Sequence, residues 1–189
     1  STTPRETPSA LTPTDPTAPP AVSSQARTAR RIDNLKGLEN VGHVAPGLYR
    51  GAQPSKEGLR TLKELGIRTV VNLRHYHGDT EMEECGKLGL HYIRFRLESS
   101  DAPSDEDVRS FLEIVTDPAH RPVYFHCHHG KDRTGTLCAA YRMAVEDWSL
   151  DEALTELDAF GFHAIWKDLR AYVKGFPDRK DRIWPKNRE

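Results

Sequence analysis

Short apolar runs alternate with amphipathic stretches along most of the chain. The apolar runs predict buried strands, and apolar residues repeated every three or four positions predict helices. We expect strands at residues 67–73, 90–97 and 121–126, and helices at 56–65, 80–88, 134–145 and 163–173, with two more that begin after Ser104 and after Ser149. Ser55, Ser104 and Ser149 stand where N-caps are needed, the last in the capping box Ser149-Leu-Asp-Glu152. This alternation predicts an α/β fold, a central, largely parallel sheet flanked by helices on both faces.

Composition divides the chain into two parts. Residues 1–30 are rich in Pro, Thr, Ser and Ala and nearly empty of large apolar side chains, so we predict a disordered leader or linker there. Residues 31–189 have the length of one ordinary domain. The sequence starts at Ser1 and not at Met, as it would after removal of an export signal, and a Pro/Thr-rich stretch follows. These two features favour, by a small margin, a periplasmic or secreted protein over a cytoplasmic one.

Charge and cysteine content narrow the function classes. The chain has 27 basic and 28 acidic residues, so no overall positive field favours nucleic acid or bulk membrane binding, and no apolar run is long enough to span a bilayer. Three cysteines, Cys85, Cys127 and Cys138, form no disulfide framework. We expect a monomer without bridges, in which Cys138 is a core residue and neither spare thiol protects Cys127.

The candidate chemistry lies in the signature stretch His126-Cys-His-His-Gly-Lys-Asp-Arg-Thr-Gly135, between a predicted strand and a predicted helix. At such a junction the backbone N–H groups of a tight loop and the helix N-terminus form an anion cradle. Cys127 is the candidate nucleophile, and the guanidinium of Arg133 can hold two phosphoryl oxygens. Thr134 is expected to hydrogen-bond the sulfur, and Gly130 to relieve a sharp turn. His126 is expected to order the loop from behind.

Two other interpretations of this stretch fit less well. A metal site of His126, Cys127, His128 and His129 is disfavoured because consecutive side chains diverge and zinc motifs leave residues between ligands. A nucleotide-binding loop at Gly130-Lys131 would need a glycine where Phe125 stands and Ser or Thr where Asp132 stands. We therefore expect no metal and no organic cofactor.

The signature stretch resembles that of the protein tyrosine phosphatase superfamily: His-Cys, five residues, then Arg-Thr/Ser-Gly. Residues 47–55 and 66–74 are similar to segments of the compact atypical dual-specificity phosphatases, and the resemblance covers about residues 40 to 175. It implies hydrolysis of phosphomonoesters through a phosphocysteine intermediate, with Gly135 counted among the substrate-binding positions.

The general acid has two main candidates. Asp101 lies in a polar loop after a predicted strand and resembles the mobile acid loop of the superfamily. Asp132 lies inside the signature stretch, as in myotubularin-type lipid phosphatases, although Lys131 and Arg133 should keep it ionised. Asp105 is a poorer third candidate, because acidic residues after a Ser N-cap have an ordinary helix-start explanation. The sequence leaves this choice open.

The loop interior suggests the substrate. Lys131, with His128 and His129, gives a cationic loop similar to that of phosphoinositide 3-phosphatases, and the tyrosine-phosphatase-like phytases share the scaffold. We expect a phosphoinositide or inositol polyphosphate substrate. The alternatives are a protein phosphotyrosine or dual-specificity phosphatase, and a catalytically silent phosphate-binding module.

Outside the signature stretch, we expect Arg74 to lie at the rim of the site. We expect solvated loop positions for Arg50, Gln53, His75 and His77, and packing roles for Trp148, Trp166 and Trp184.

Overall fold

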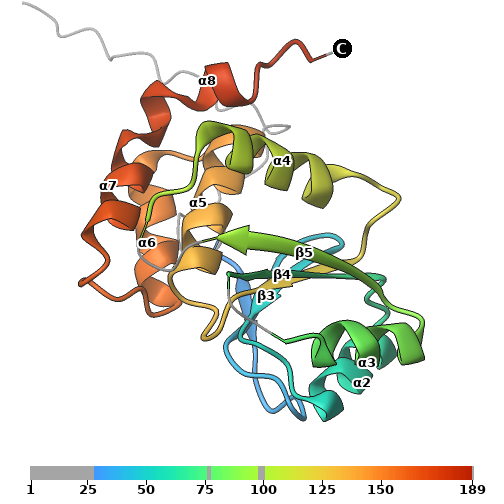
Figure 1. Ribbon diagram of the computed structural model, residues 1–189. Coiled ribbons are helices and arrows are strands. Elements are labelled where there is room, and N and C mark those ends of the chain that lie inside the picture. The colour runs from blue at the N-terminus through green and yellow to red at the C-terminus, as the bar shows by residue number, and fades with distance from the viewer. Residues whose placement is uncertain (1–27, 76–77, 98–100, 189) are drawn as a thin grey trace, which may run out of the picture.

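A six-stranded sheet forms the centre of the computed structural model, which describes residues 28–75, 78–97 and 101–188 (Figure 1). The strands are β1 (Arg30–Ile32), β2 (Val41–Ala45), β3 (Leu48–Gly51), β4 (Thr69–Arg74), β5 (His91–Leu97) and β6 (Val123–His126), in the order β1-β2-β3-β6-β4-β5. The pairs β3·β6, β6·β4 and β4·β5 are parallel, and β1·β2 and β2·β3 are antiparallel. The sheet is therefore parallel at its centre, as predicted.

Helices cover both faces of the sheet (Figure 1). One face carries α2 (Lys56–Glu64) and α3 (Thr80–Leu88), and the other carries α4 (Asp105–Thr116), α5 (Arg133–Val145), α6 (Leu150–Ala159), α7 (Lys167–Gly175), a 3₁₀ turn (Phe176–Asp178) and α8 (Lys180–Ile183). Each face has its own apolar cluster, with Tyr124 of β6 on the α2 and α3 side and Phe125 on the α5 side. In the described part of the chain, no helix is both long and apolar enough to cross a membrane.

The predicted serine caps are present. Ser55 accepts a hydrogen bond from the Gly58 N–H, and Ser104 and Ser149 each form a capping box. The last predicted helix begins later than expected, at Lys167 rather than at residue 163. Residues 163–166 form a turn instead, in which the Trp166 N–H donates to His163 O at 3.1 Å.

The N-terminal boundary and the first hairpin differ from the sequence-based description. Residues 1–27 of the predicted leader lie outside the described residues, but Ala29 is buried and its N–H donates to Glu156 Oε2 at 2.8 Å. Arg30 already begins β1, so the folded part of the chain starts before residue 31. Strands β1, β2 and β3 were not predicted, because none of them is a continuous apolar run: β1 begins with two arginines, and β2 and β3 contain glycine together with histidine or arginine.

Candidate active site

The signature loop, residues 127–132, joins the carboxyl end of β6 to the start of α5. Side chains alternate along a strand, so Tyr124 and His126 face the α3 side while Phe125 and Cys127 face the α5 side. Cys127 is 2% exposed, at the carboxyl edge of the central strands. This is the position at which open α/β sheets bind their ligands.

The carbonyl groups of the loop are held outward by residues from other elements. Gln53 N–H donates to His128 O at 3.1 Å, and Arg50 Nη2 donates to Gly130 O at 3.0 Å. Asn40 Nδ2 lies 3.3 Å from the same Gly130 oxygen. In a planar trans peptide the N–H points opposite to the C=O, so outward carbonyls turn the following N–H groups inward. The loop is therefore built as an anion cradle.

Gly130 is required by this geometry. Its φ is +72°, and a Cβ there would lie 2.3 Å from Gly51 C and 2.5 Å from Gly51 O. Both the left-handed backbone and the close approach of β3 exclude a side chain. The predicted sharp turn at Gly130 is confirmed. The close approach of β3 is a second reason for glycine at this position, and the sequence alone did not show it.

Arg50 lies beneath the loop and not in a solvated segment, so that expectation was wrong. It is fully buried, and its guanidinium stacks over the Phe160 ring at 4.2 Å while Nη2 holds Gly130. Within the described residues, Arg50 Nε and Nη1 have no hydrogen-bond partner. A buried, incompletely paired cation next to the loop favours a bound anion.

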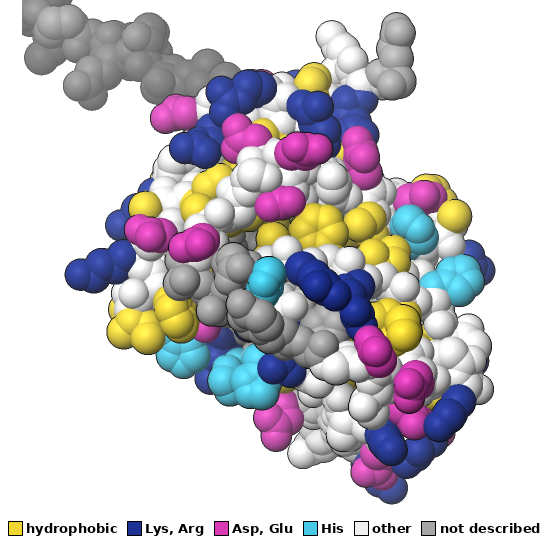
Figure 2. Space-filling view, viewed as in Figure 1, with side chains coloured by type: hydrophobic (Ala, Val, Ile, Leu, Met, Phe, Trp, Pro, Cys, Tyr) yellow, Lys and Arg dark blue, Asp and Glu magenta, His cyan; other side chains and the backbone are white. Residues whose placement is uncertain are grey.

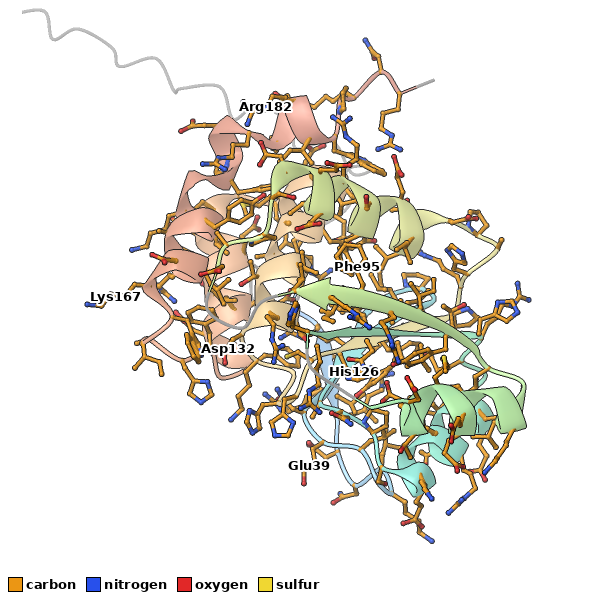
Figure 3. All side chains as sticks on the ribbon, viewed as in Figure 1. Glu39, Phe95, His126, Asp132, Lys167 and Arg182 are labelled. Atoms are coloured by element: carbon orange, nitrogen blue, oxygen red, sulfur yellow. The ribbon has the colours of Figure 1, made fainter. Side chains whose placement is uncertain are left out.

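His126 supports the loop from the opposite face, as expected. Its Nδ1 lies 2.8 Å from Cys127 O and therefore carries the proton, since a carbonyl can only accept. Its Nε2 lies 3.0 Å from Glu81 Oε2, and both side chains are buried between the sheet and α3 (Figure 3). The sequence did not single out Glu81, because acidic residues in the first turn of a helix have an ordinary explanation.

Three signature residues open α5. Arg133, its first residue, is half-buried, and its Nη1 lies 3.5 Å from Leu97 O at the end of β5. Thr134 is fully buried, and within the described residues its hydroxyl has no hydrogen-bond partner, so the expected bond to the Cys127 sulfur is not formed. Gly135 packs against α6, because a Cβ there would lie 2.7 Å from Leu157 Cδ1.

Two neighbouring hollows lie at the loop. The smaller, of about 180 Å³, is the cradle; it is lined by Cys127, His128, His129, Asp132, Arg133 and Trp166. The larger, the basin of about 720 Å³, shares His128 and His129 with the cradle and also includes Arg74, Gln53 and Glu39. Arg74 thus lies at the predicted edge and hydrogen-bonds Gln53, while His77 lies outside the described residues. Trp166 lines the cradle, contrary to the packing role expected from the sequence.

Histidine side chains gather at one edge of the molecule below α6 and α7 (Figure 2). The exposed rings of His128 and His129 meet edge to face at 4.2 Å. Partial burial, together with the charges of His129, Arg74 and Arg133, lowers the pKa of His128 below its usual value. His128 therefore enters the cradle at neutral pH as an uncharged hydrogen-bonding ring and gains charge only in more acidic solution.

The two candidate acids have different surroundings. Both carboxylate oxygens of Asp132 accept hydrogen bonds at 2.8 Å from His163, one from the backbone N–H and one from Nδ1. Asp101 is exposed and follows residues 98–100, which lie outside the described residues. No hydrogen bond in the described part of the chain joins Asp101 to the loop. Asp105, the third candidate, is paired with Arg179 and Arg182 at the start of α4.

The remaining predicted positions are Lys131 and the spare thiols. Lys131 is half-buried, with its aliphatic stem against Gly161. Cys85 and Cys138 are buried, and burial raises the pKa of each to about 12. The described residues contain no group of three His, Cys, Asp or Glu side chains that could hold a metal ion.

Comparison with known proteins gives consistent results. The family model described as "DSP-PTPase phosphatase fused to NAD+ Kinase" matches residues 33–169. Dual specificity protein phosphatase TpbA of Pseudomonas aeruginosa is 31% identical over 139 residues, covering 72% of this chain and 62% of that protein. Inositol diphosphatase SIW14 of Saccharomyces cerevisiae is 30% identical over 156 residues, covering 79% of this chain and 55% of that protein. The chain thus spans less than two thirds of these relatives' length.

Solved structures of the same two proteins are similar to this one. The core catalytic domain of SIW14 superimposes with a TM-score of 0.68 at 26% identity, covering 79% of this chain and 93% of that structure. TpbA also gives a TM-score of 0.68, at 28% identity, covering 81% of this chain and 92% of that structure. The similarity therefore extends over the sheet, the signature loop and the helices on both faces.

Proposed function

The chain belongs to the atypical dual-specificity phosphatases of the cysteine-dependent protein tyrosine phosphatase superfamily, and we propose that it hydrolyses phosphomonoesters through a phosphocysteine intermediate. The observation that carries this proposal is the placement of Cys127 in a loop whose carbonyls are held outward, with Arg133 at its end. A thiolate in a cradle of N–H donors, beside a guanidinium, is suited to attack a bound phosphoryl group.

In the proposed reaction, Cys127 Sγ forms a bond to phosphorus as the bond from phosphorus to the leaving oxygen breaks. The leaving oxygen takes a proton from a carboxylic acid. Water then attacks the phosphocysteine, gives a proton to the same carboxylate, and releases phosphate and the thiolate. The unpartnered, buried hydroxyl of Thr134 is available to stabilise the departing sulfur.

We propose Asp101 as this acid. Both oxygens of Asp132 already accept hydrogen bonds from His163, so this carboxylate is engaged with the segment after α6. Asp101, in contrast, is exposed, and within the described residues it has no hydrogen bond to His163. Asp101→Asn should therefore reduce turnover of alkyl phosphates far more than turnover of p-nitrophenyl phosphate, while Asp132→Asn should not show this dependence on the leaving group.

The proposed substrates are inositol polyphosphates or phosphoinositide head groups. A ring with several phosphates requires anion-binding positions beyond the cradle, and the adjoining basin contains Arg74. Among the relatives, SIW14 is named an inositol diphosphatase. A second candidate, phosphotyrosine in proteins, is favoured by the likeness to TpbA, one structure of which is a complex with pTyr.

The test is phosphate release from inositol hexakisphosphate, phosphoinositides and a phosphotyrosine peptide under reducing conditions. Wild type, Cys127→Ser and the matched control Cys138→Ser would be compared, since Cys138 is buried against Glu156 and away from the cradle. We expect release that Cys127→Ser abolishes and Cys138→Ser retains. Binding without release by the wild type would instead favour a silent phosphate-binding module. A monomer and a periplasmic or secreted location remain predictions.

A further inference from the structure

The segment between α6 and α7, residues 160–166, places one aromatic side chain at the cradle. Trp166 is half-buried and lines the same hollow as Cys127 and Arg133. It is the N-cap residue of α7, and its carbonyl accepts from Arg170 N–H at 3.1 Å. The next residue, Lys167, points away from Asp132 toward solvent (Figure 3). The indole is therefore fixed at the mouth of the cradle by the start of a helix.

A clamp ties this segment to the signature loop. Asp132 accepts two hydrogen bonds from His163, each at 2.8 Å, and Trp166 N–H donates to His163 O at 3.1 Å. The Asp132 side chain is 14% exposed and the His163 side chain 47%, so the carboxylate end of this pair is largely covered by protein. Through His163, the loop that carries Cys127 sets the position of Trp166.

The lining of the cradle is chemically mixed. Trp166 forms an aromatic wall, next in sequence to Ile165, a residue that is 73% exposed. His128 and His129 also line the cradle, and they line the basin that holds Arg74 as well. A substrate whose phosphate reaches Cys127 would place its ring against the indole and its other charged groups over the basin.

We propose that Trp166 is a substrate-binding residue that packs against the carbon face of a cyclitol ring, and that Asp132 and His163 are positioning residues for it. This inference rests on the proposed function and adds the feature that selects the ring. An indole face gains contact area from ring C–H groups, while the remaining phosphates of a cyclitol suit the basin, which contains Arg74. A phosphotyrosine ring could also meet the indole, but it would leave the basin without an anionic partner.

Binding measurements separate this wall from catalysis. In a Cys127→Ser background, Trp166→Ala should weaken binding of inositol hexakisphosphate about tenfold, the size of one lost stacking contact. Affinity for inorganic phosphate, which has no ring to pack on the indole, should fall far less. Trp184→Phe is the matched control, because Trp184 lies at the end of α8 beneath Arg188.

Intrinsic fluorescence provides a second readout. The change on adding inositol hexakisphosphate should disappear in Trp166→Phe and persist in Trp184→Phe. If Trp166→Ala and the background protein bind inositol hexakisphosphate equally well, Trp166 is not a substrate-binding residue. An equally large loss of affinity for inorganic phosphate would also contradict the proposal, since it would indicate that the cradle itself has collapsed. A loss confined to a phosphotyrosine peptide would overturn the cyclitol assignment. If binding depends on Trp166 but the wild-type protein releases no phosphate, the role of Trp166 in binding stands and the proposed catalysis is wrong.

The clamp is tested by exchanging its donor. His163→Ala removes the Nδ1 donor and should raise KM for an inositol polyphosphate more than it lowers kcat. His163→Asn, whose side-chain amide can donate to Asp132, should restore much of that KM. If both variants raise KM equally, or if the change falls on kcat alone, His163 does not position Trp166.

Discussion

Substitution of Gly130 by alanine tests the packing of the signature loop against β3. A Cβ at Gly130 would lie 2.3 Å from Gly51 C, 2.5 Å from Gly51 O and 2.6 Å from Ala52 N. These backbone atoms have little freedom to move, because Ala52 N–H donates to Glu39 O at 3.0 Å and Ala52 O accepts from Tyr124 at 2.5 Å. The loop would therefore have to shift away from β3.

The magnitude follows from two contributions. Placing alanine at a φ of +72° costs about 1–2 kcal/mol, and overpacking a closed site costs about 1–3 kcal/mol more. Gly66 is the matched control: its φ is +89°, but nothing lies within 4 Å of its Cβ position. Gly66→Ala should therefore cost only the backbone contribution, about 1–2 kcal/mol.

The assay is urea unfolding of both variants together with phosphate release. Gly130→Ala should lose about 1–3 kcal/mol more of the unfolding free energy than Gly66→Ala, and a displaced cradle should lower its kcat/KM about 100-fold. Gly66→Ala should keep its activity. Equal stability losses in the two variants, with full activity in Gly130→Ala, would refute the close packing of this loop against β3.

Three further predictions concern groups around the site. Glu81→Leu should lower the unfolding free energy by about 1–3 kcal/mol, because it leaves a buried imidazole nitrogen unpaired; Glu81→Gln, whose amide can still hydrogen-bond that nitrogen, should cost less in the same urea experiment. Iodoacetamide at neutral pH should modify Cys127 alone, since burial raises the pKa of Cys85 and Cys138 to about 12; peptide mass spectrometry that finds either of them alkylated in the folded protein would contradict this. Burial alone would raise the pKa of Glu156, but its hydrogen bonds and charge pairing with a buried arginine lower the pKa below the ordinary 4.5. The stabilisation by Glu156 is therefore complete above that value and is lost as pH falls through the lowered pKa, so the stability gap between wild type and Glu156→Gln should narrow in acid.

The parts of the fold that depend on local sequence were predictable. Helix starts follow from residues three apart, as in the capping boxes of Ser104 and Ser149, and buried strands follow from apolar runs. The placement of Cys127 and Arg133 followed from the junction of one strand and one helix. The hairpin of β2 and β3 was missed because glycine, histidine and arginine interrupt its apolar residues, whereas β6 is a nearly continuous apolar run.

The supports of the site were not predictable, because they come from distant parts of the chain. Arg50 reaches Gly130 from 80 positions away, and Glu81 reaches His126 from 45 positions away. His163 meets Asp132 across 31 positions. The spacing of apolar residues along the chain predicts helices and strands but not contacts between distant residues. The topology, which places β3 beside β6 and α6 beside α5, brings these side chains together.

Trapping of the covalent intermediate tests the central claim most directly. The enzyme would be mixed with radiolabelled substrate, quenched in alkaline denaturant within a single turnover, digested and mapped by mass spectrometry. The account predicts label on the peptide that contains Cys127, present in wild type and in Cys138→Ser and absent in Cys127→Ser. Turnover with no labelled protein, or label on a neighbouring histidine in place of Cys127, would contradict it.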